Sequence, residues 1–308
     1  MSMAAAQRSQ SVTDHTEFWL TPASYLLPAH FPVSAWLTHA SFASWIMDVL
    51  RPAAVAELGT HYGFSAFAFA EAAKRLRTGT TIYAMDSWEG DDHAGFYSEE
   101  VYDYVKSVVD AEYRESITLV RGWFSETRSQ FDEASVDLLH IDGRHAYEDV
   151  LTDYHEWRST VRDGGVILFH DIAERGGGFG VWQLWDEIAE PGRSFTFEHG
   201  HGLGVLAVGE ISSEPLRALF GADDATAARI REDFVRLGDV VHHRAWLDSL
   251  PGELDRLNAL AHERAILVNE LTAADAGHKE YIDSLRSSTS WRVTAPLRAL
   301  GRLRPRGE

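Results

Sequence analysis

The chain has 308 residues, of which 45% are hydrophobic and 24% charged, and its formal net charge is −19. This length suits one large domain with additions or two modest domains. The chain has no cysteine, which excludes disulfides, thiol nucleophiles and cysteine-ligated metals, so any metal must bind Asp, Glu, His or carbonyl oxygen. Its acidity argues against nucleic acid as a partner, because phosphate recognition needs a basic face.

Residues 1–50 combine a polar, proline-punctuated stretch with a helical pattern. Pro22, Pro28 and Pro32 indicate an irregular N-terminal arm. The spacing of apolar residues over 34–50 predicts a helix with Ser34 as its N-cap. We therefore expect an arm and one helix before the first strand.

Residues 51–209 alternate short apolar runs with segments of helical periodicity. The first five runs predict parallel strands at 53–58, 80–85, 116–120, 136–141 and 165–170. Strands separated by helices at this rhythm indicate an α/β fold with a doubly wound, Rossmann-like, mostly parallel sheet. Two further runs, 194–199 and 203–209, flank Gly-His-Gly and predict an antiparallel hairpin that closes the sheet edge.

The pattern changes after Gly209, where strand signals end. Residues 210–249 predict a helical linker, and residues 250–286 predict either a coiled coil or one amphipathic helix lying on its own domain. Between positions 250 and 285, apolar residues occupy eight of eleven places spaced alternately by four and three. The exceptions are Arg264, Asp275 and His278. A coiled coil here would make the chain a homo-oligomer.

Candidate site residues follow the predicted strands, because ligands bind doubly wound sheets at the carboxyl ends of the strands. Gly59 and Gly63 lie in the first strand–helix turn, where close backbone approach and a helix N-terminus favour an anionic group. Asp86 ends the next strand, where an acidic residue commonly accepts hydrogen bonds from ribose hydroxyls. Together they predict a nucleoside-type cofactor site, with two ordinary loops as the alternative.

The turn Glu57-Leu58-Gly59-Thr60-His61-Tyr62-Gly63-Phe64-Ser65 lacks the glycine triplet of dinucleotide sites. It resembles the first motif of class I S-adenosylmethionine-dependent methyltransferases, in particular the metal-assisted O-methyltransferases of the catechol type. Four more motifs resemble a bacterial methyltransferase family often encoded with, or fused to, polysaccharide glycosyltransferases: Asp86–Asp91, His140–Tyr147, Phe169–Asp171 and His199–Gly204. The resemblance covers roughly residues 34–209 and is more specific for fold and cofactor than for substrate.

This resemblance implies S-adenosylmethionine as the cofactor. Asp86 would hold the ribose and Trp88 would pack on the adenine, with plain core packing as the alternative for Trp88. The implied cofactor-binding residues are Glu57, Gly59, Thr60, Gly63, Ser65, Asp86, Trp88 and Asp142.

Asp142 and Asp171 follow two successive strands that a parallel sheet places side by side. Converging carboxylates repel one another unless a cation or proton lies between them, which favours a metal. In the resembling catechol-type and macrocin-type enzymes the matching positions bind Mg²⁺, with a further ligand beside the second carboxylate. Here that neighbour is His170, so the expected ligands are Asp142, His170 and Asp171. The expected metal is Mg²⁺, with Mn²⁺ or another divalent metal as the alternative, because imidazole suits Mn²⁺, iron or zinc better. The alternative is a metal-free Asp142 paired with Arg144 or with the amino group of the cofactor.

His145 matches an Asp-x-x-His arrangement of the macrocin-type enzymes, where the histidine resembles the general base. A sugar hydroxyl is too weakly acidic to attack a sulfonium methyl unaided, so a metal and a base would supply what is missing. The glycine-rich run 175–180 predicts a mobile lip where an acceptor enters. His199 and His201 either reach the same cleft or serve only the hairpin.

The basic tail, residues 287–308, is similar to a short C-terminal sequence on many bacterial cell-surface polysaccharide enzymes. Six arginines and one glutamate lie between positions 286 and 308. Such a tail would contact an anionic membrane surface or a glycosyltransferase, or it would be a solvated end. Because no apolar run is long enough to span a membrane and no signal peptide is present, we expect a cytoplasmic protein, peripheral to the inner face of the membrane if the tail binds lipid.

These observations predict a metal-assisted O-methyltransferase that acts on a sugar hydroxyl in surface-glycan or glycosylated-metabolite biosynthesis. Two alternatives stay open. One keeps the cofactor and changes the acceptor to an amine or a phenolic small molecule. The other is a non-catalytic scaffold for glycan-assembly enzymes.

Overall fold

The computed structural model describes residues 17–91 and 95–302. The chain divides between Leu247 and Asp248 into two compact units. The part of the predicted arm before residue 17 and the end of the basic tail after residue 302 lie outside the described residues. The five-part division expected from the sequence stays a prediction.

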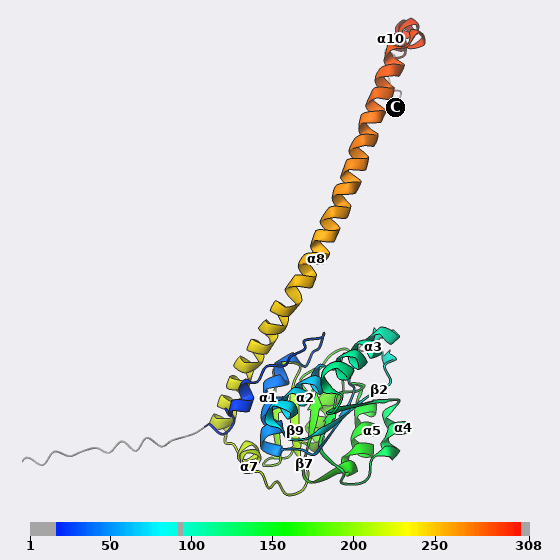
Figure 1. The fold of residues 1–308 in the computed structure, drawn as a ribbon. Coiled ribbons are helices and arrows are strands. Elements are labelled where there is room, and N and C mark those ends of the chain that lie inside the picture. The colour runs from blue at the N-terminus through cyan, green and yellow to red at the C-terminus, as the bar shows by residue number, and fades with distance from the viewer. Residues whose placement is uncertain (1–16, 92–94, 303–308) are drawn as a thin grey trace, which may run out of the picture. The chain divides into compact units, whose positions relative to one another are not determined.

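The first unit is built on a seven-stranded sheet with the order β5-β2-β1-β6-β7-β9-β8 (Figure 1). The five strands from β5 to β7 are parallel, whereas β9 runs antiparallel to both β7 and β8. The predicted α/β sheet with its antiparallel hairpin is confirmed. The strands are β1 (Ala54–Leu58), β2 (Thr81–Asp86), β5 (Ile117–Arg121), β6 (Val136–Ile141), β7 (Val161–His170), β8 (Ser194–Phe197) and β9 (Leu203–Ala207).

Helices cover both faces of this sheet (Figure 1), so each face has its own hydrophobic core. One core includes residues of α1 (Ala40–Leu50), α2 (Phe64–Leu76), α3 (Glu99–Val108), α7 (Glu214–Phe220) and the start of α8 (Asp224–Ser287). The other packs against α4 (Phe124–Thr127), α5 (Tyr147–Trp157) and α6 (Val181–Ile188). A short antiparallel pair, β3 (Gly90–Asp91) and β4 (Gly95–Phe96), lies between β2 and α3 in the chain.

Alternate residues of the central strands enter opposite cores. Leu138 of β6 belongs to one core, whereas Leu139 and Ile141 belong to the other. A strand buried on both faces has apolar residues on both, so its sequence is mostly an apolar run without strict alternation, and in β6 the polar residues Asp137 and His140 are buried as well. This is why the runs predicted the strands closely.

Three boundaries differ by more than two residues from the sequence-based expectation, and the other strand ends differ by two residues or fewer. The predicted helix over 34–50 is a 3-10 turn, Leu37–His39, followed by α1. Ser34 as its N-cap is wrong, because the Ser34 hydroxyl accepts from the Trp36 amide at 3.0 Å, before the helix begins. Strand β7 begins at Val161 rather than 165, with a register shift against β6. Helix α8 begins at Asp224 and passes through Pro251, so one helix runs through most of the expected helical linker, 210–249, and the helix expected over 250–286.

The second unit contains the rest of α8 and two short helices, α9 (Thr289–Val293) and α10 (Ala295–Arg302). The Ser288 hydroxyl caps α9 by accepting from the Trp291 amide at 3.3 Å. The Arg298 guanidinium lies 3.9 Å from the centre of the Trp291 ring. Among the described residues, none of the helices combines the length and the apolar character that crossing a membrane would need.

Gly59 lies where the β1–α2 turn packs against the loop between β6 and α5. Its φ is +95°, and a Cβ there would lie 1.9 Å from the carbonyl oxygen of Asp142. Gly79 also has a positive φ, +73°, but a Cβ there would meet nothing within 4 Å. Comparing substitutions at the two glycines therefore separates the cost of backbone strain from the cost of a steric clash.

We expect Gly59→Ala to cost about 3 kcal/mol or more of unfolding free energy, because overpacking against backbone adds to left-handed strain. Gly79→Ala should cost only about 1–2 kcal/mol, from the strain alone. Chemical denaturation of both variants measures the difference. Equal losses would show that the β1–α2 turn can move away from the β6–α5 loop.

Candidate active site

A cavity of about 580 Å³ opens at the carboxyl ends of the parallel strands. Strand β1 lies between β2 and β6. The strands that follow β1 are added on one side of it up to β5 and on its other side from β6 onward, and doubly wound folds bind ligands at this reversal of strand order. The volume falls in the range of small-molecule sites. The lining includes the β1–α2 turn, the ends of β2 and β7, and the loop after β6.

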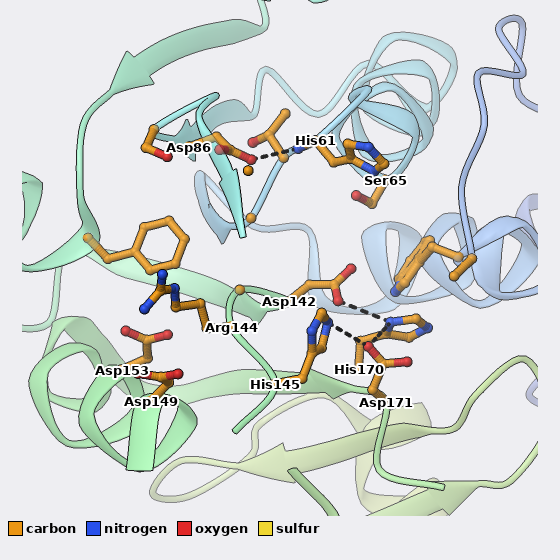
Figure 2. A pocket seen from close by; sticks show the side chains of 18 of the residues that line it. His61, Ser65, Asp86, Asp142, Arg144, His145, Asp149, Asp153, His170 and Asp171 are labelled. Carbon is orange, nitrogen blue, oxygen red and sulfur yellow. Dashed lines mark hydrogen bonds and ion pairs between the residues drawn. The ribbon is translucent and has the colours of Figure 1, made fainter. Parts of the chain in front are cut away.

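The β1–α2 turn and Asp86 form one end of the cavity (Figure 2). The Asp86 carboxylate accepts from the His61 amide at 2.8 Å and from the Trp88 amide at 2.7 Å. These two bonds hold the carboxylate at the end of β2. Of the predicted cofactor-binding residues, the cavity lining includes Gly59, Thr60, Ser65, Asp86 and Asp142.

Glu57, Gly63 and Trp88 are not among the described residues that line the cavity. Glu57 is fully buried, and its Oε1 lies 3.2 Å from Nδ1 of His140. Trp88 is buried in the core, where its indole nitrogen donates to the His61 carbonyl at 3.0 Å. Trp88 therefore packs in the core, as the alternative interpretation expected. The cofactor contacts of Glu57, Gly63 and Trp88 stay predictions.

Asp142, His170 and Asp171 converge at the other end of the cavity (Figure 2). Each offers a ligand atom, and these atoms lie within 4.8 Å of one another. His170 Nδ1 is 3.0 Å from Asp142 Oδ1 and 3.3 Å from Asp171 Oδ2. Its Nε2 lies 3.1 Å from the carbonyl oxygen of Gly200. A carbonyl can only accept, so Nε2 carries a proton and Nδ1 is the nitrogen that faces the carboxylates.

The electrostatics of this cluster follow from burial and charge. Burial alone would lower the pKa of His170, but the charges of Asp142 and Asp171 outweigh it and raise that pKa well above its usual range. Burial alone would raise the pKa of Asp171, whereas His170 and His145 lower it below the ordinary range. The two carboxylates therefore attract positive charge, either an imidazolium or a bound cation.

His145 lies beside this cluster and contacts Asp171. Its Nε2 is 2.9 Å from Asp171 Oδ2, and its ring stacks on Phe179 with the ring centres 4.5 Å apart. Asp171 has a φ of +60°, a strained conformation for a residue with a side chain. The carboxylate orients the imidazole, and Phe179 fixes the plane of the ring. Both His145 and Phe179 line the cavity.

A fully buried histidine, His39, lies next to His170 and was missed by the sequence analysis. Its Nε2 lies 2.9 Å from the Gly200 carbonyl, the same oxygen that His170 approaches. Burial, and then the neighbouring His170 and His199, lower the pKa of His39 well below its usual range. A neutral His39 thus holds the Gly200 carbonyl in place. No spacing in the sequence connects position 39 to position 200.

Helix α5 contributes an acidic wall that the sequence analysis also missed. Asp149 and Asp153 line the cavity from this helix, and Arg144 lines it from the preceding loop (Figure 2). Glu156 lines the cavity from the same helix. Burial first, and then the charges of Asp149 and Glu156, raise the pKa of Asp153 to about 7, against the opposing effect of Arg144. The spacing of four and three along one helix face was the available signal.

The predicted lip follows Asp171. Phe179 of the run 175–180 and the preceding Glu174 line the cavity, and Arg175 lies over the Trp182 ring at 4.4 Å. The mobility of this loop stays a prediction. Of the two hairpin histidines, only His201 is among the described lining residues, and its Nδ1 lies 2.6 Å from Glu174 Oε1.

Comparison with known protein families matches residues 56–172 to the model of a methyltransferase domain. The chain carries a methyltransferase domain. The matched residues run from β1 to just past Asp171, so they include the glycine turn, Asp86 and the Asp142–His170–Asp171 cluster. The match confirms the methyltransferase expected from the sequence motifs, and it does not identify the acceptor.

The individual proteins that resemble this chain either align over only part of their length or have low sequence identity to it. An uncharacterized protein of Sinorhizobium fredii is 45% identical over 192 residues, which are 62% of this chain and 21% of the relative. The chain thus spans about a fifth of that relative. An O-methyltransferase of Bacillus cereus in complex with S-adenosylhomocysteine is 18% identical, with a TM-score of 0.45, over 59% of this chain and 84% of that one. An O-methyltransferase of Streptomyces achromogenes, involved in tomaymycin synthesis, is 13% identical, with a TM-score of 0.44, over 58% and 82%.

Proposed function

We propose that the chain transfers a methyl group from S-adenosylmethionine to a hydroxyl oxygen of its acceptor. The observation that carries the proposal is one cavity with two chemically distinct ends. The β1–α2 turn and Asp86 suit the ribose and the amino-acid part of the cofactor at one end. At the other end lie His145 and three potential metal ligands.

The donor set fits a divalent cation. Two carboxylates and one imidazole nitrogen lie close enough to share an ion, and the Gly200 carbonyl fixes the ring so that Nδ1 faces the carboxylates. Mg²⁺ prefers oxygen ligands, whereas an imidazole ligand favours Mn²⁺, iron or zinc. A bound cation would polarise the acceptor hydroxyl. Asp142, His170 and Asp171 would hold it, and His145, oriented by Asp171, would take the proton.

We propose a sugar hydroxyl as the acceptor, on the strength of the sequence motifs and of the polar groups near His145. The Glu174–His201 pair offers donors and acceptors to a sugar at the cavity mouth. A phenolic acceptor is the second candidate, favoured by the aromatic part of the cavity lining. These aromatic residues are Trp36, Tyr62, Phe64, Tyr97, Trp123, Phe124 and Phe179.

Calorimetric titration of the full chain with S-adenosylhomocysteine tests the cofactor and the metal together. We expect binding in the micromolar range or tighter, and tighter in Mn²⁺ or Mg²⁺ than in chelator. Equal affinity in chelator and metal would contradict the metal, and absence of binding in every buffer would contradict the enzyme and favour the scaffold. Transfer of a labelled methyl group to a panel of free sugars, with catechol alongside, then separates the acceptor classes.

A further inference from the structure

The second unit exposes an apolar stripe along α8, which we call the seam. Its positions are 254, 257, 261, 264, 268, 271, 275, 278, 282 and 285. The six large apolar side chains of the seam are each between 42% and 61% exposed. Alternating spacings of three and four place them on one helix face. An apolar surface of this length, exposed to water, indicates an interaction site.

Two opposite charges interrupt the seam and restrict what can cover it. Arg264 and Asp275 occupy seam positions eleven residues apart. If two copies paired in parallel and in register, each would meet its own copy, so that arginine faced arginine and aspartate faced aspartate. Like charges opposed within a seam disfavour that pairing. Arg264 makes no ion pair within the described part of the chain, and Asp275 pairs only with Lys279 of the next turn, at 2.6 Å.

We propose that the seam binds the seam of a second copy of this chain in antiparallel orientation, with each Arg264 opposite Asp275 of the partner subunit. A single alignment brings these two charges together, with its two-fold axis between positions 269 and 270. That alignment matches every other seam position as well. The layers are Leu254 with Leu285, Leu257 with Ile282, Ala261 with His278, Arg264 with Asp275, and Val268 with Leu271.

The residues that flank the seam agree with this alignment. On one side Leu260 falls opposite Tyr281 of the partner subunit, and Leu267 opposite Ala274, which widens the apolar contact. On the other side Asn258 falls opposite Lys279, with no like charges opposed. The exposed Asp275–Lys279 pair within one helix contributes little by itself, so Asp275 is available to the partner's Arg264. In the layer that pairs Ala261 with His278, the small alanine side chain leaves room for the larger histidine.

Sedimentation of the full chain and its charge-reversal variants tests the pairing. The wild type should sediment with twice the 34.4 kDa mass of one chain. R264D and D275R should each weaken the dimer at least about tenfold, because each creates two like-charged layers. An equimolar mixture of R264D and D275R should dimerise again, because every layer then pairs opposite charges. A monomeric wild type, or reversals without effect, would overturn the proposal.

R256D and D283R are the matched controls, since they reverse the same charges on the outer side of the helix. They should leave the dimer unchanged. Loss of the dimer in these controls would mean that net charge, not the seam, governs association, and would overturn the proposal. The proposed methyl transfer plays no part in this test, so either proposal can fail alone.

Cysteine cross-linking tests the orientation, and the absence of native cysteine gives a clean background. In the antiparallel dimer Leu257 faces Ile282 of the partner subunit. Under oxidation, L257C and I282C should therefore not cross-link alone, whereas their mixture and the double variant should form intermolecular disulfides. Self-cross-linking of either single variant would indicate a parallel dimer and overturn the orientation.

Discussion

Asp171→Asn is expected to abolish metal binding and to lower methyl transfer by about 10³-fold or more, because Asp171 contacts both the proposed general base, His145, and the proposed metal ligand His170. Its Oδ2 lies 2.9 Å from His145 Nε2 and 3.3 Å from His170 Nδ1. The amide keeps the shape of the carboxyl but loses its charge. Removing the carboxylate that orients a general base costs on this order in other enzymes.

Asparagine also suits the backbone at this position, so the fold should survive the change. Asp171 has a φ of +60°, and asparagine adopts left-handed conformations more readily than most residues. Alanine here would add a backbone cost to the chemical one. The asparagine variant therefore isolates the chemistry, and circular dichroism should show an unchanged fold.

Direct titration with Mn²⁺ and turnover of the best acceptor from the sugar and catechol panel measure the two effects separately. Asp103→Asn, on the exposed side of α3, is the matched control and should change neither. Wild-type Mn²⁺ affinity in Asp171→Asn would remove Asp171 from the proposed metal site. Retained turnover would remove it from the reaction.

The fold was largely predictable from the sequence because the central strands are buried on both faces. The run 136–141 has apolar residues facing both cores, and the observed strand β6 has the same bounds, Val136–Ile141, although it also buries Asp137 and His140. Boundaries failed where tertiary contacts decide them. Helix α8 passes through Pro251, which a local reading takes as a break, and the start of α8 buries Ile230 and Phe234 in the core.

The candidate site was predictable where topology alone brings residues together. Asp142 and Asp171 follow neighbouring parallel strands, so their convergence follows from the strand order. His39 and the stacking of Phe179 on His145 were not predictable, because they depend on how an N-terminal segment and a glycine-rich loop fold back over the sheet ends. Glu57 is a motif position whose cofactor contact stays a prediction, and its pairing with the buried His140 was likewise not predictable from the sequence.

His145→Gln is expected to lower turnover by about 10²–10⁴-fold, the usual range for a positioned general base, while Mn²⁺ and S-adenosylhomocysteine affinities stay as in the wild type. Glutamine keeps a polar side chain near Asp171 but cannot take up a proton at neutral pH. His145 contacts Asp171 but is not one of the three proposed ligands, so its loss leaves all three in place. This pattern differs from that of Asp171→Asn, which should lose both binding of the metal and turnover.

The pH dependence of turnover gives the readout that a purely structural role would not move. A base must be unprotonated to accept a proton, so the wild-type rate should rise with pH as the imidazolium loses its proton and then level off. His145→Gln should lack this rise, whereas His155→Gln, on the exposed side of α5, should retain it along with full turnover. A variant at 145 that keeps the wild-type profile would show that the proton leaves by another group, and one that loses Mn²⁺ binding would show that His145 belongs to the metal site instead.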